Sequence, residues 1–280
     1  MRAIAATLLG AAGITVLPFL MAQVNPVGQT IYERFAPINV TGNWVSVVTE
    51  DWQIRMITPK KGDFVGLPLN AAGQKAGNDW DPSKETAADA CKAYAAPGLL
   101  RLPGRLKVSW QDGGNTLRID TDAGQQTRLL HFTGDEPKGQ AGWLGFSAAN
   151  WDYAGGFIPA TRLTSVSIAD TPPPPAQGGA GGRGGRGRGG PPTTPQGGAL
   201  KVVTTHLKAG YLRKNGIPFS KDAVLTEFFN VYPDPYGTDW MVVTSTLHDP
   251  AYLAVDYITS TNFKREQDGS KWRPRPCSTL

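Results

Sequence analysis

The feature that most restricts the fold is a series of short β-type segments joined by tight-turn signals. Residues 105–132 read RLKVSWQDGGNTLRIDTDAGQQTRLLHF, in which segments rich in Val, Leu, Ile and Thr alternate with turns that contain Asp and Gly. This spacing is typical of successive β-hairpins. Asn215-Gly216 gives another strong turn signal between two apolar segments. The chain is therefore expected to be mainly β.

The whole pattern predicts about nine to eleven strands in one antiparallel β-barrel or sandwich with a small α-helical insertion. The expected strands cover residues 42–49, 52–58, 105–110, 116–121, 128–132, 143–153, 155–170, 200–212, 223–232, 240–247 and 256–266. The helical insertion lies within residues 66–98. There Asn70 is expected to cap one helix, while Asp81 and Pro82 begin another whose inward-facing stripe includes Cys91.

The N-terminal 22 residues have the form of a secretory signal peptide. Arg2 is followed by an uncharged apolar run that ends in a small residue, Ala22. The alternative is an uncleaved membrane anchor, since the run is long enough to span a bilayer. The prediction is a periplasmic or secreted protein with no integral membrane span after signal cleavage. In an oxidising compartment the two cysteines, Cys91 and Cys277, are expected to form a disulfide, the alternative being buried free thiols.

Residues 171–198 form a Gly-, Pro- and Arg-rich segment without periodicity or large apolar side chains. It is expected to be a disordered loop that interrupts a single domain over residues 23–280, the alternative being a linker between two domains. Its match to the dinucleotide fingerprint lacks the required preceding strand and following helix. The formal net charge is +5, of which Arg2 and the three arginines of this segment carry four. The near-neutral remainder argues against a nucleic-acid partner.

No sequence motif identifies a reaction, and neither a metal site nor a cofactor is expected. The three histidines are dispersed, without the close spacing of a metal site. One hypothesis is a hydrolase or isomerase that uses His131 or His206 with Asp120. The other reading of these residues is a half-buried histidine and a turn-capping aspartate.

Charged groups at strand ends suggest a ligand-binding rim. Arg55 follows the first strand, and Arg213 and Lys214 follow Tyr211 near the Asn-Gly turn. Arg55, His131, His206 and Tyr211 are the candidate ligand-binding residues. The alternative is a solvated surface whose ion pairs contribute little stability.

The segment TGNWVSV places Gly42 and Trp44 at the first expected strand. This Gly-x-Trp resembles the start of lipocalin-like, or calycin, barrels. The resemblance implies a barrel in which Trp44 is structural and packs on a basic side chain of the last strand, here Lys264 or Arg265. Unlike that family, this chain carries helices between its early strands.

A second resemblance covers nearly the whole chain after the N-terminal segment. It is similar to an acidobacterial-type family of exported bacterial proteins with no assigned activity. The resemblance rests on EDWQIRMITPKKGDFVGLPLN, KVVTTHLKAGYLRKNGIPFS and ITSTNFKREQDGSKWRPRPC. The resemblance supports export. It implies no activity, so the function has to be inferred from individual residues.

The leading hypothesis is non-catalytic binding of a small, largely apolar ligand inside the barrel. The alternatives are the exported enzyme described above and a structural or interaction module of the cell envelope. The sequence does not specify an oligomeric state.

Overall fold

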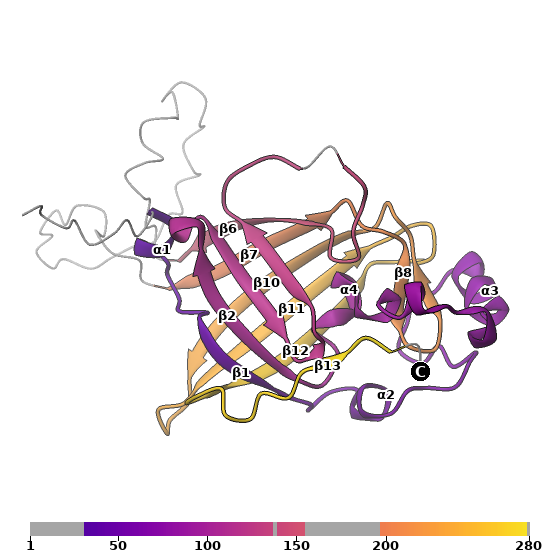
Figure 1. Cartoon of the computed structure of the whole chain (residues 1–280), viewed down its shortest axis with the longest axis horizontal. Coiled ribbons are helices and arrows are strands. Elements are labelled where there is room, and N and C mark those ends of the chain that lie inside the picture. The colour runs from indigo at the N-terminus through magenta and orange to yellow at the C-terminus, as the bar shows by residue number, and fades with distance from the viewer. Residues whose placement is uncertain (1–30, 137–138, 155–196, 279–280) are drawn as a thin grey trace, which may run out of the picture.

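A closed β-barrel forms the body of the molecule (Figure 1). The computed structural model describes residues 31–136, 139–154 and 197–278. In this part of the chain, nine strands close in the order β1-β12-β11-β10-β7-β6-β5-β3-β2. The predicted mainly β fold is confirmed, and the barrel is the form it takes. The expected signal peptide, the strand over residues 155–170 and residues 171–196 lie outside the described residues.

The barrel strands follow the expected segments closely, and the other elements are short. The barrel strands are β1 Gly42–Val47, β2 Arg105–Gln111, β3 Thr116–Thr121, β5 Thr127–His131, β6 Phe146–Tyr153, β7 Gly198–Thr205, β10 Val224–Pro233, β11 Asp239–His248 and β12 Tyr257–Glu266. The remaining strands are β4 Ala123–Gly124, β8 Gly210–Arg213, β9 Ile217–Phe219 and β13 Arg275–Pro276. The α-helices are α1 Ile31–Arg34, α2 Trp52–Met56, α3 Ala71–Asp79 and α4 Ala96–Leu99, and the 3-10 turns are η1 Pro82–Lys84, η2 Ala87–Asp89, η3 Lys92–Tyr94 and η4 Asp112–Gly114.

The barrel closes where the first strand pairs with the last long strand. β1 lies antiparallel between β12 and β2, with Trp44 opposite Arg265 and Leu106. Neighbouring barrel strands are antiparallel except β5 and β6, which run parallel. Outside the barrel, β13 pairs in parallel with β4, and β8 forms a hairpin with β9.

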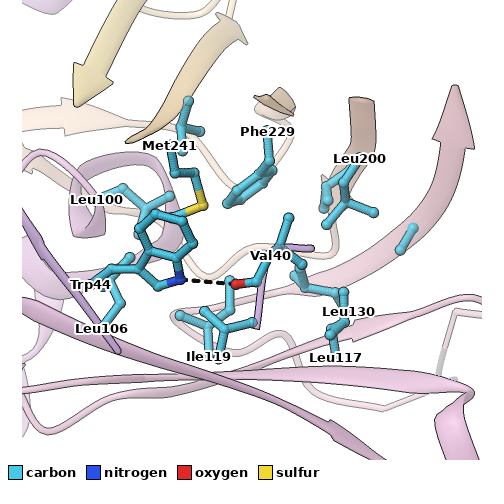
Figure 2. Close-up of a cluster of buried hydrophobic side chains, with 14 of the residues drawn as sticks. Val40, Trp44, Leu100, Leu106, Leu117, Ile119, Leu130, Leu200, Phe229 and Met241 are labelled. Carbon is cyan, nitrogen blue, oxygen red and sulfur yellow. Dashed lines mark hydrogen bonds between the residues drawn. The ribbon is translucent and has the colours of Figure 1, made fainter. Parts of the chain in front are cut away.

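The barrel interior is filled by large side chains. Trp44, Phe229, Met241 and Phe263 are at most 1% exposed and belong to one apolar cluster with residues from the other strands. Figure 2 shows the Trp44 and Phe229 rings, the Met241 side chain and the surrounding aliphatic groups gathered in this cluster. Packing of this kind leaves little space for a guest molecule, since protein interiors reach the density of organic crystals.

Trp44 is held by a hydrogen bond at the edge of its ring and by a cation on one face. Its Nε1 donates to the carbonyl oxygen of Val40 at 2.9 Å (Figure 2), and the Arg265 guanidinium carbon lies 4.1 Å from the ring centroid. The contact between Trp44 and a basic side chain of the last barrel strand is therefore present, and Arg265 makes it. Arg265 also donates to the backbone oxygens of Asn39 and Thr41, so it ties the lead-in segment to the barrel.

Three expectations about secondary structure were wrong. Residues 52–58 begin with the helical turn α2, because the backbone N–H groups of Ile54 and Arg55 both donate to the Asp51 carbonyl. Residues 200–212 are two strands, because His206 adopts a φ of 56° that ends β7 before β8 begins. The helix expected from Asp81 is a series of short turns, in which Thr86 caps a separate 3-10 turn.

The predicted turn at Asn215-Gly216 is confirmed, and it makes a sharp test of local packing. Gly216 has a φ of +78°, and a Cβ there would lie 2.1 Å from the Trp80 ring. We expect Gly216→Ala to lower the free energy of unfolding by about 1–3 kcal/mol in urea denaturation. Gly237→Ala is the control, because Gly237 has a φ of +80° and nothing within 4 Å of the added Cβ. Equal losses in the two variants would contradict the packing role of Trp80.

Candidate functional site

A groove outside the barrel is the main candidate site. Its volume is about 350 Å³, and residues of α2, α4, β4, β8 and β13 line it together with Tyr257 at the start of β12. In Figure 1, α2, α3, α4 and β8 gather at one end of the barrel, whereas α1 lies at the other end. The groove is thus formed mainly by α2, α4 and the short strands at this end of the barrel.

The groove is strongly basic. Five cationic side chains line it, and its lining contains no Asp or Glu from the described part of the chain. The five cations are Arg55, Arg101, Arg213, Lys214 and Arg275. A concave surface lined by one sign of charge attracts ligands of the opposite sign.

Arg55 is the most buried of these cations. Its side chain is only 2% exposed, although it extends from the largely exposed turn α2. Its Nε donates to the carbonyl oxygen of Arg101 at 3.0 Å, and its Nη1 donates to Glu50 Oε1 at 2.9 Å. Its buried Nη2 has no hydrogen-bond partner among the described residues. Burial, aided by the nearby charge of Arg101, lowers the pKa of Arg55.

Arg213 of β8 is held in a similar way, by a hydrogen bond to a backbone carbonyl. Its Nη1 donates to the carbonyl oxygen of Val65 at 2.8 Å, and its buried Nη2 lacks a partner among the described residues. Arg101 is held differently, because its Nη1 donates to the Ser260 carbonyl at 2.8 Å while its Nη2 pairs with Asp51. As far as the described residues show, Arg55 and Arg213 therefore each keep one donor nitrogen without an acceptor.

Lys214 and Tyr94 form another part of the basic wall. The Lys214 ammonium lies 4.9 Å from the Tyr94 ring centroid and donates to Ser278 Oγ at 3.3 Å. Burial of the Tyr94 phenol opposes its ionisation, but hydrogen bonding with Lys214 and Ser278 outweighs burial and lowers the pKa of Tyr94. The lowered pKa is consistent with a positive environment on this side of the groove.

The groove also has an apolar wall. Leu212 is buried, Ile54 and Leu102 are half-buried, and Met56 is 60% exposed at the edge. These side chains share the cavity with the cations. The arrangement suits a molecule with an acidic group and a hydrocarbon body.

The predicted disulfide is confirmed, and it holds one wall of the groove in place. Cys91 and Cys277 are bonded across a sequence separation of 186 residues. The bond fixes the C-terminal segment beside β4, where the N–H of Arg275 donates to the Asp122 carbonyl. Arg275 thereby joins a groove whose other cations come from far earlier in the chain.

The histidine candidates lie elsewhere. Arg128 and Leu130 of β5 point into the barrel, so His131 faces outward, where its ring stacks on Phe146 with centroids 5.2 Å apart. His206 follows β7 and lies 3.0 Å from Glu136. Neither ring lines the groove.

Asp120 also does not fit the hypothetical histidine–aspartate pair. Its carboxylate accepts hydrogen bonds from Arg118 Nε and from Thr127 Oγ1. These hydrogen bonds join neighbouring residues of the β3–β5 pairing on the outside of the barrel. No contact between Asp120 and a histidine is found among the described residues.

Tyr211 lines a separate, smaller cavity of about 70 Å³ next to Trp80. Its hydroxyl donates to Glu85 Oε1, which also accepts from Trp80 Nε1 at 3.0 Å. Burial and the adjacent Glu85 carboxylate raise the pKa of Tyr211 to about 12. Of the four candidate ligand-binding residues, only Arg55 lines the groove.

Comparisons with protein-family models, curated proteins and solved structures found no match. Within the described residues, no group of three or more His, Cys, Asp or Glu side chains is placed to hold a metal ion. Among the described helices, none has the length and hydrophobicity required to cross a bilayer. The geometry of the groove is therefore the basis for a functional proposal.

Proposed function

We propose that this chain is an exported, non-catalytic binding protein for a small ligand with a large apolar part. We also propose that the ligand occupies the groove beside the barrel and not the barrel interior. One contrast supports this location: the interior is filled by fully buried side chains, whereas the groove offers about 350 Å³. That volume lies within the range of small-molecule sites.

The disulfide supports the proposed export. Disulfides such as Cys91–Cys277 persist mainly in oxidising compartments, including the bacterial periplasm and the extracellular space. The expected signal peptide points to the same compartments. A periplasmic or secreted location would give the protein access to ligands outside the cytoplasm.

A thermal-shift panel tests ligand binding. We expect medium-chain amphipathic compounds, such as decanoate, to raise the melting temperature, because a ligand at 100 times its Kd stabilises the folded state by about 2.7 kcal/mol. Leu102→Trp should remove this shift by filling the groove. Leu129→Trp, the same substitution on the outer face of β5, should preserve it. The proposal fails if the panel produces no shift, or if Leu102→Trp binds as the wild type does.

A further inference from the structure

We infer that the ligand carries an oxyanion, either a carboxylate or a phosphate, and that Arg55 and Arg213 bind it. This inference rests on the proposed function and specifies the chemical class of the ligand. It is based on the charge balance of the groove and on two buried guanidinium nitrogens that have no partner among the described residues.

The unpartnered nitrogens favour an acceptor that the described residues do not supply. Leaving a donor of a buried charged group without an acceptor is costly. Arg55 and Arg213 each carry one such Nη2, and both residues line the groove. An oxyanion that reaches these nitrogens from the groove would supply the missing acceptors.

Both guanidinium groups are already oriented by the protein. Arg55 is held by the Arg101 carbonyl and Glu50, and Arg213 is held by the Val65 carbonyl. Little side-chain entropy would then be lost on binding, which favours affinity. Guanidinium groups are also well suited to carboxylate and phosphate oxygens, because their planar donors match both geometries.

The charge balance leaves a positive excess that a ligand can neutralise. Glu50 pairs with both Arg55 and Arg101, and Asp51 pairs with Arg101. Across the described residues, no salt bridge engages the other three cations of the groove, Arg213, Lys214 and Arg275. An anion of one or two charges would therefore offset part of this positive excess.

Several other arginines of the chain pair with a carboxylate, in contrast to Arg213. Arg105 pairs with Glu266, Arg118 with Asp120 and Arg265 with Asp239. Within the described part of the chain Arg128 also has one unpartnered nitrogen, but Arg128 pairs with Glu227 and does not line the groove. Arg213 combines an unpartnered buried nitrogen, a place in the groove and no carboxylate partner among the described residues.

Three ligands of equal chain length test the inference by titration calorimetry: decanoate, decyl phosphate and decanol. We expect at least one of the two anions to bind the wild type about tenfold more tightly than decanol, because the alcohol lacks the negative charge and the second acceptor oxygen of the anions. Tight binding of decanoate alone would identify a carboxylic acid as the ligand. Tight binding of decyl phosphate alone would identify a phosphate headgroup.

The variant Arg213→Gln tests whether Arg213 binds the anionic group. It should weaken anion binding about tenfold and leave decanol binding unchanged. Arg118→Gln is the matched control, since it removes the same charge from the outside of the barrel and should leave all three affinities unchanged. Arg55→Gln should act as Arg213→Gln does, and Arg213→Gln keeps the test valid if loss of the buried Arg55 impairs folding.

The outcomes separate the inference from the proposed function. If none of the three ligands binds the wild type, the proposed function fails and the inference fails with it. If decanol binds as tightly as both anions, the proposed function stands and the inference is overturned. The inference is also overturned if Arg213→Gln weakens the binding of all three ligands equally.

Discussion

Glu227→Ala is expected to lower the free energy of unfolding by about 3–5 kcal/mol, the largest loss we expect from one substitution in the barrel. Glu227 and Arg128 form an ion pair in which both side chains are only 1% exposed. Arg128 also donates to Ser147 Oγ at 3.2 Å and to Thr204 Oγ1 at 2.8 Å. Removing the carboxylate would leave the buried charge of Arg128 without its counter-ion.

A double variant is the control for this prediction. Replacing a buried ion pair by apolar residues of similar size is often neutral or stabilising, so Arg128→Met combined with Glu227→Leu should recover most of the loss. Urea denaturation of the three proteins measures both effects. A loss below about 1 kcal/mol for Glu227→Ala would mean that water solvates Arg128, which would contradict a packed barrel interior.

Replacing both cysteines by serine is expected to lower the free energy of unfolding by about 4–5 kcal/mol. The bond closes a loop with a sequence separation of 186 residues, for which chain-entropy models give about 5 kcal/mol, and measured losses are often smaller. The C-terminal segment should also detach locally, because β13 is only two residues long. Arg275 would then leave the groove, and anion binding would weaken.

Two measurements check this second prediction. Guanidinium denaturation gives the stability of the Cys91→Ser/Cys277→Ser variant, and titration with decanoate gives its affinity. The reduced wild type should behave as the variant does, which controls for the serine substitutions. Wild-type stability in the variant would contradict the account of the disulfide, and unchanged decanoate affinity would contradict a role for Arg275 in the groove.

The sequence predicted the barrel strands well because hairpins depend on local signals. The segments around β2 and β3 carry alternating apolar residues and end at Gly-containing turns, and these features act over a few residues. The predicted strand over residues 52–58 was wrong for the opposite reason. There the apolar side chains of Trp52, Met56 and Ile57 are exposed, and a buried arginine decides how the segment packs.

The groove could be predicted only in part. Arg55, Arg213 and Lys214 were identifiable as charges at strand ends, and the structure brings all three to one cavity. Arg101 and Arg275 could not be foreseen, because their positions depend on the packing of α4 and on the disulfide at Cys277. The histidines were candidates because imidazole often acts as an acid or base in catalysis. In β5, however, the alternation of buried and exposed side chains turns His131 away from the interior.

A crystal structure with bromine-labelled decanoate tests the central claim most directly, because the anomalous signal of bromine locates the ligand without prior assumptions. We predict a bromine peak beside Leu102 and Leu212, with the carboxylate within hydrogen-bond distance of Arg55 and Arg213. A bromine peak inside the barrel, among Trp44 and Phe229, would contradict the account.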